Sequence, residues 1–133
     1  MRDNIRINQR EKVNMITVYQ IQMTESTYDT INALGREKAM ETIPAYEAYM
    51  ETIVFGAQRW KDNMAQHYSK VCEIDCNDLE DAFRISNTYQ EDTITMIADR
   101  MRSLSVGDIC VENGAAYLVD RCGFERVDVS MAA

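Results

Sequence analysis

The sequence predicts an α+β domain with a small, mostly antiparallel sheet that ends in a three-stranded C-terminal meander, and with helices packed on one face. Two observations support this prediction. Segments rich in β-branched residues alternate along the chain with amphipathic helical segments. The dipeptide Asn113-Gly114 joins two short apolar segments, which is the strongest short signal for a β-hairpin. A partly closed barrel is the alternative architecture.

The chain of 133 residues predicts one domain, residues 15–133, preceded by a flexible N-terminal arm, residues 1–14. The arm has no hydrophobic period. It holds four of the 14 basic side chains and two of the 22 acidic ones, so the remaining residues carry a net charge of −10. This acidity disfavours nucleic acid as a partner, because its phosphates are also negative. An acidic nucleic-acid mimic that inhibits a host protein is one alternative that the charge leaves open.

The first elements are a strand and a short helix. Residues 15–23, MITVYQIQM, are rich in β-branched side chains and predict a strand. Tyr28, Ile31 and Leu34 follow at three-residue spacing and predict an amphipathic helix, which Gly35 ends.

A second helical region follows. Residues 36–43 favour a helix that stops before Pro44, and this proline suits the first position of another helix. Gly56 closes that helix, and residues 57–67 give no clear pattern.

Residues 68–75 predict a second strand, with Tyr68, Cys72 and Cys76 on one face and Val71 on the other. The next segment, DLEDAFRISN, predicts a helix capped by Asn77 or Asp78, with acidic residues in its first turn. Residues 90–101 fit either a helix or a short strand and turn.

The C-terminal meander follows from the turn at Asn113-Gly114. A two-residue loop there pairs Glu112 with Ala115 and sets the register of the strands near 108–112 and 115–120. A further turn leads to a third strand near 124–129. We expect the face that carries Ile109 and Leu118 to point into the core.

Polar residues at the strand ends of this meander form a possible ligand rim. Asp108, Asp120 and Arg121 are its candidate groups. They predict a small-ligand, nucleotide-like binder or an enzyme that uses this rim, as an alternative to protein binding. The same residues are also ordinary turn residues.

Aromatic residues provide a second set of candidates, because aromatic side chains are enriched in interface hot spots. Tyr46, Tyr49, Trp60 and Tyr89 are the possible interface residues. Burial in the core is the competing interpretation for each of them.

Motifs for catalysis or metal binding are absent from the sequence. The four cysteines have C-x3-C and C-x11-C spacings, which are not those of zinc sites, and we predict neither metal nor cofactor. No phosphate-binding loop or nucleophile elbow occurs, and His67 is the only histidine. No catalytic residue is predicted, and the balance favours a protein that is not an enzyme.

Three phrases in the second half of the chain resemble a known group of proteins. They are DLEDAFRISN at 78–87, RSLSVGD at 102–108 and NGAAYLVDRCGFERV at 113–127. The chain is similar there to small proteins of bacteriophages and plasmids, including the YodL-like group of mobile-element proteins. The resemblance implies a phage or mobile-element accessory protein in the bacterial host cytoplasm, and it supplies no catalytic residues.

The leading functional hypothesis is therefore a non-enzymatic accessory protein that acts through protein–protein interaction. Its partner would be a host or phage protein, or a second copy of the chain. The polar N-terminus and the absence of a long apolar run give no indication of secretion or of membrane binding.

Overall fold

The computed structural model describes residues 14–88 and 91–131. The predicted flexible arm lies outside these residues except for Asn14, which begins the first strand. In chain order the elements are β1 (Asn14–Gln20), α2 (Glu25–Leu34), α3 (Arg36–Thr42), α4 (Pro44–Phe55), the 3-10 helices η1 (Gly56–Arg59) and η2 (Asp62–His67), β2 (Ser69–Cys76), α5 (Leu79–Thr88), the 3-10 helix η3 (Glu91–Thr93), β3 (Ile94–Met96), β4 (Ile109–Glu112), β5 (Ala115–Val119) and β6 (Phe124–Val127).

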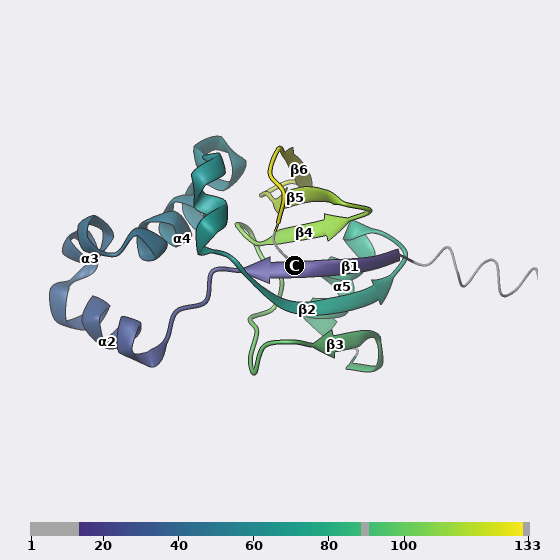
Figure 1. Ribbon diagram of the computed structural model, residues 1–133, viewed down its shortest axis with the longest axis horizontal. Coiled ribbons are helices and arrows are strands. Elements are labelled where there is room, and N and C mark those ends of the chain that lie inside the picture. Colours follow the sequence, from purple (N-terminus) through teal and green to yellow (C-terminus); the bar gives the residue numbers. More distant parts are fainter. Residues whose placement is uncertain (1–13, 89–90, 132–133) are drawn as a thin grey trace, which may run out of the picture.

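The strands form one six-stranded sheet in the described part of the chain, in the order β3-β2-β1-β4-β5-β6 (Figure 1). Every neighbouring pair is antiparallel, which confirms the α+β class and the C-terminal meander. β1 lies inside the sheet and pairs with β2 on one side and β4 on the other.

The hairpin of the meander forms as its turn sequence predicts. Asn113 and Gly114 have φ of 52° and 81°, the positive values that a two-residue hairpin turn requires. Glu112 pairs with Ala115 and Ile109 with Leu118, in the predicted register. β6 then adds the third strand.

Local signals set the ends of the N-terminal helices. The Thr24 side chain accepts a hydrogen bond from the Thr27 N–H and caps α2, and Gly35 ends α2 with a φ of 86°. Pro44 is the first residue of α4, and Gly56 ends it. These are the boundaries that the sequence predicts.

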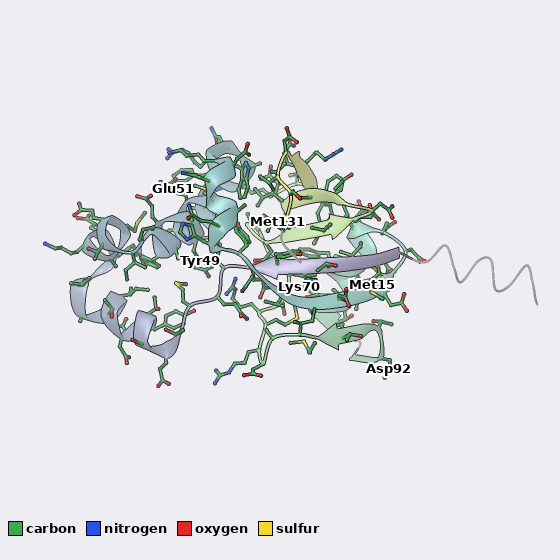
Figure 2. All side chains as sticks on the ribbon, viewed as in Figure 1. Met15, Tyr49, Glu51, Lys70, Asp92 and Met131 are labelled. Atoms are coloured by element: carbon green, nitrogen blue, oxygen red, sulfur yellow. The ribbon has the colours of Figure 1, made fainter. Side chains whose placement is uncertain are left out.

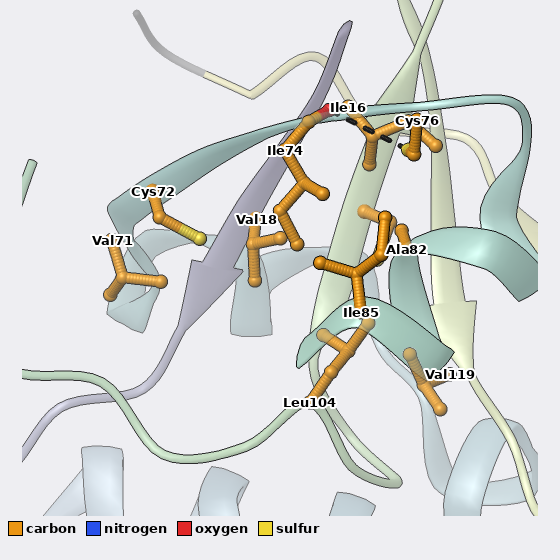
Figure 3. Packing of buried hydrophobic residues seen from close by; sticks show 11 residues of the cluster. Ile16, Val18, Val71, Cys72, Ile74, Cys76, Ala82, Ile85, Leu104 and Val119 are labelled. Carbon is orange, nitrogen blue, oxygen red and sulfur yellow. Dashed lines mark hydrogen bonds between the residues drawn. The ribbon is translucent and has the colours of Figure 1, made fainter. Parts of the chain in front are cut away.

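The sheet has a core on each face, so the helices cover both faces rather than one. Ile16 and Val18 of β1 pack with α5 in one cluster, where Ala82 and Ile85 come from the helix (Figure 3). The second cluster includes Tyr19, Ile21, Ala48, Met64 and Leu118, and it joins the other face to α4 and η2. The cause is visible in the sequence of β1, because adjacent residues of a strand point to opposite faces and both Val18 and Tyr19 are apolar.

An irregularity between Val18 and Tyr19 changes how β2 presents its side chains. Val18 pairs with Cys72 but Tyr19 pairs with Lys70, so Val71 is the extra residue of a bulge. The prediction that Tyr68 and Cys72 share a face, with Val71 opposite, was therefore wrong. Val71 and Cys72 pack in the same cluster, and Tyr68 packs in the other.

Of the two alternatives for residues 90–101, the structure has the short strand and turn. β3 contains three residues and forms one edge of the sheet.

Candidate functional site

The most distinctive surface is the helical extension, defined as residues 22–43 with α2 and α3. It projects from the end of the sheet, beyond α4 (Figure 1). α2 packs mainly against its neighbour α3 and has no buried residue. Every other α-helix in the described ranges has at least one buried residue, so α2 is exceptional in this fold.

The apolar stripe of α2 consists of Tyr28, Ile31 and Leu34, which lie on one side of the helix because of their three-residue spacing. Tyr28 is 45% exposed and Leu34 is 38% exposed. A helix of ten residues is marginal in water without tertiary packing. Capping by Thr24 and Gly35 supports this helix, but Tyr28 and Leu34 of its apolar stripe remain exposed, and Ile31 between them is half-buried.

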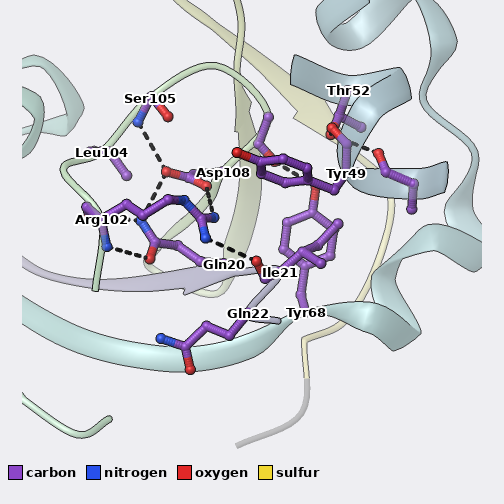
Figure 4. Close-up of polar contacts among 12 residues, drawn as sticks. Gln20, Ile21, Gln22, Tyr49, Thr52, Tyr68, Arg102, Leu104, Ser105 and Asp108 are labelled. Atoms are coloured by element: carbon purple, nitrogen blue, oxygen red, sulfur yellow. Dashed lines mark hydrogen bonds and ion pairs between the residues drawn. The ribbon is translucent and has the colours of Figure 1, made fainter. Parts of the chain in front are cut away.

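A polar network lies beside the two chain segments that connect the helical extension to the rest of the fold, and we call it the polar clamp (Figure 4). It consists of Gln20, Tyr49, Arg102, Ser105 and Asp108. Gln20 is fully buried at the end of β1. Its Nε2 donates to the Arg102 carbonyl at 2.9 Å and to Asp108 Oδ2 at 3.0 Å, and its Oε1 accepts from the Arg102 N–H at 3.2 Å.

Arg102 ties three segments together within the polar clamp. Its Nη1 donates to the Ile21 carbonyl at 3.1 Å, and its Nη2 lies 3.5 Å from Asp108 Oδ1. The guanidinium also lies over the ring of Tyr49, 5.1 Å from the centroid. Tyr49 belongs to α4 and stands where the extension meets the sheet (Figure 2), so the clamp fixes the base of the extension.

Asp108 is the buried carboxylate of the clamp, with 3% of its surface exposed. Burial raises the pKa of this carboxyl to about 6, because the charged form loses its hydration. The Ser105 N–H, the Arg102 guanidinium and the Gln20 amide oppose that rise, since each stabilises the carboxylate. A buried carboxyl whose pKa lies below neutral pH by only a small margin thus stands at a junction between elements.

The loop of the RSLSVGD phrase is shaped by the same junction. Gly107 has a φ of 96°, and a Cβ there would lie 2.8 Å from Thr52 Oγ1. Its carbonyl accepts a hydrogen bond from the buried Tyr68 hydroxyl. Leu104 is buried in the first core, and its N–H donates to Ser86 Oγ at 2.8 Å. Packing and hydrogen bonding account for this phrase without a ligand.

A cavity of about 740 Å³ lies at the base of the extension. Its apolar lining includes Met23, Tyr28 and Met101. Glu25 and Asp99 are the acidic residues of the lining, and Arg100 and Arg102 are its basic residues. The stripe of α2 therefore continues, through Tyr28, into a recess beside the sheet.

The structure does not bring the three residues of the predicted ligand rim together. The Asp108 side chain belongs to the polar clamp. Asp120 Oδ1 instead accepts from the N–H groups of Arg121 at 2.9 Å and Ala57 at 3.4 Å. The Arg121 guanidinium donates to the Val54 carbonyl. Asp120 and Arg121 line a cavity of about 250 Å³, but Asp108 does not.

The predicted interface aromatics that the structure describes pack within the fold. Tyr46 is buried, and Tyr49 is half-buried beneath Arg102. Trp60 is also half-buried and meets Tyr68 edge-on, with ring centroids 6.0 Å apart. Tyr89 lies outside the described residues.

The cysteines are free thiols, and only Cys122 is exposed. Burial raises the pKa of Cys72 and of Cys76 to about 12, and it also raises that of Cys110. Over residues 14–88 and 91–131, no group of three or more His, Cys, Asp or Glu side chains is placed to hold a metal ion. No helix within these ranges is long and apolar enough to cross a membrane.

No family model, curated protein or solved structure matches this chain. The site is therefore defined by its geometry alone. The sequence predicts α2 as an amphipathic helix, but its pattern alone gives no sign that the stripe is a contact surface. Gln20 has no local signal either, because its role depends on residues more than 80 positions away.

Proposed function

We propose that this chain is a non-enzymatic interaction protein that binds another protein through its helical extension. The main support is that α2 carries an apolar stripe and yet has no buried residue. Covering apolar surface is favourable by about 25 cal/mol per Å², so a partner that covers the stripe gains free energy. Exposed apolar surface rimmed by polar residues is typical of protein-binding sites.

The polar clamp suits this role, because it holds the base of the extension against the sheet. Arg102 contacts Tyr49 of α4 and the carbonyl of Ile21, so both chain connections of the extension are anchored. A fixed base lowers the entropy lost when the extension meets a partner. The resemblance of RSLSVGD to phage and mobile-element proteins supports an accessory role in the bacterial cytoplasm.

Site-specific photocrosslinking in bacterial cells tests the proposal. Tyr28→p-benzoylphenylalanine places the reactive group on the stripe, and Phe83→p-benzoylphenylalanine is the matched control on α5, where Phe83 is 37% exposed. We expect a discrete protein adduct from position 28 alone. The additional change Leu34→Ser should abolish it, because it interrupts the stripe. Adducts of equal yield from both positions, or none from position 28, would overturn the proposal.

A further inference from the structure

The stripe of α2 has the spacing and the exposure of a helix-binding surface. Tyr28 and Leu34 are among the large apolar residues that the fold leaves exposed, and Ile31 lies between them. An amphipathic helix docks by laying apolar residues at i, i+3, i+4 and i+7 against such a surface. The cavity beside Tyr28 offers a recess for one or two of those side chains.

Carboxylates border this stripe. Helical spacing places Glu25 and Asp29 along one side of it, and both side chains are exposed. On α3, the exposed carboxylates of Glu37 and Glu41 are matched in number by the exposed basic side chains of Arg36 and Lys38, so the negative charge of the extension lies on α2, beside the stripe. None of these four carboxylates forms an ion pair within the described portion of the chain. They are therefore free to meet positive charges from outside.

The charge around the stripe also distinguishes between the molecules that could cover it. A second copy would bring together two extensions that each carry four acidic and two basic side chains, in a protein whose net charge is −8, and the excess of like charges would repel. Nucleic acid and anionic lipid surfaces are negative as well. A helix with an apolar face and basic flanks complements both the stripe and its carboxylates.

We infer that the helical extension binds a basic amphipathic helix of another protein. This inference rests on the proposed function and adds the chemistry of the partner. Apolar residues of that helix cover Tyr28, Ile31 and Leu34, and its lysines or arginines meet Glu25 and Asp29. Salt weakens such a complex, because the charged groups remain near solvent.

Selection from a display library of helix-forming 18-residue peptides tests the inference without presupposing a sequence. The full chain is the target. We expect the enriched peptides to be strongly basic, with apolar residues at helical spacing. Their affinity should fall about ten-fold with Leu34→Ser and return with Leu34→Met, as a buried apolar anchor predicts. It should fall about five-fold between 50 and 300 mM salt, as expected for exposed charge pairs.

Charge-neutralising variants distinguish the contribution of the carboxylates beside the stripe from the contribution of the overall negative charge to binding. Glu25→Gln with Asp29→Gln should weaken binding about five-fold. Glu80→Gln with Glu125→Gln removes two exposed carboxylates elsewhere and should change binding less than about two-fold.

Other results of these experiments would contradict the basic partner, or the helix-binding surface itself. Neutral or acidic peptides that depend on Leu34 would overturn the basic partner while leaving the proposed function intact. Peptides that bind equally to the Leu34→Ser variant, or no enriched peptides at all, would overturn the inference. An adduct between two copies in the crosslinking experiment would replace the basic helix by self-association through the same surface.

Discussion

Replacing Gln20 by leucine tests whether the polar clamp holds the fold together. Leucine has a similar volume but forms none of the three hydrogen bonds that join Gln20 to Arg102 and Asp108. At about 1 kcal/mol for each bond, the free energy of unfolding should fall by about 3 kcal/mol. For a domain of this size, the melting temperature should fall by about 10–15 °C.

The pH dependence of this loss identifies its cause. The Gln20 amide is one of the groups that hold down the pKa of Asp108, so Gln20→Leu should raise that pKa further above about 6. When folding raises the pKa of a carboxyl, the free energy of unfolding falls as the pH rises through the folded-state pKa. The deficit of the variant should therefore be larger at pH 8 than at pH 5.

Urea denaturation, followed by the fluorescence of the single tryptophan, Trp60, measures both effects. Gln22→Leu is the matched control, because Gln22 is exposed and, among the residues that the structure describes, donates only to the Arg100 carbonyl. It should change the free energy of unfolding by less than about 0.5 kcal/mol. A deficit below about 1 kcal/mol for Gln20→Leu, or an equal deficit at both pH values, would refute the reasoning.

Three further predictions concern single positions. Gly107→Ala should cost about 2–3 kcal/mol of stability, since φ is 96° and the new Cβ meets Thr52, whereas Gly114→Ala at an open turn should cost about 1 kcal/mol; thermal melts compare the two. Asp108→Asn removes the titration, so the unfolding free energy of the wild type minus that of the variant should fall by up to about 3 kcal/mol between pH 4 and pH 7; a constant difference would contradict the raised pKa of Asp108. Ellman's reagent should modify one thiol, Cys122, in the native protein and four in denaturant, and rapid native reaction of a second thiol would contradict the burial of the others.

The parts of the fold that the sequence predicts are those with local causes. Asn113-Gly114 determines the hairpin register because the turn needs two residues with positive φ. Gly35 and Pro44 determine helix boundaries through backbone restrictions that act within a few residues. Such signals do not depend on the rest of the chain.

Features that depend on distant residues were not predictable in this way. Nothing near Gln20 or Asp108 indicates that the two side chains meet, because 88 positions separate them. The bulge at Val71 has no local signature either, and it reversed the predicted orientation of Tyr68. Packing across the sheet determines both.

The exposed stripe of α2 illustrates a different limit. Tyr28, Ile31 and Leu34 have the pattern of a helix that buries one face, and local spacing carries no information on whether a covering element exists. Only the arrangement of the whole chain shows that the extension leaves the sheet before any element covers it (Figure 1).

The central position of β1 has a consequence for synthesis on the ribosome. Thr17 pairs with Val111, so this strand must wait for β4 to be translated. At about 5–20 residues per second, the interval between the end of β1 and the end of β4 is about 5–20 s. Throughout that interval one backbone edge of β1 is unpaired, next to the apolar side chains of Ile16 and Val18, and nascent chains on neighbouring ribosomes present the same edge. Spacing between those ribosomes, or a chaperone that shields the edge, thus becomes part of how efficiently this protein reaches its folded state.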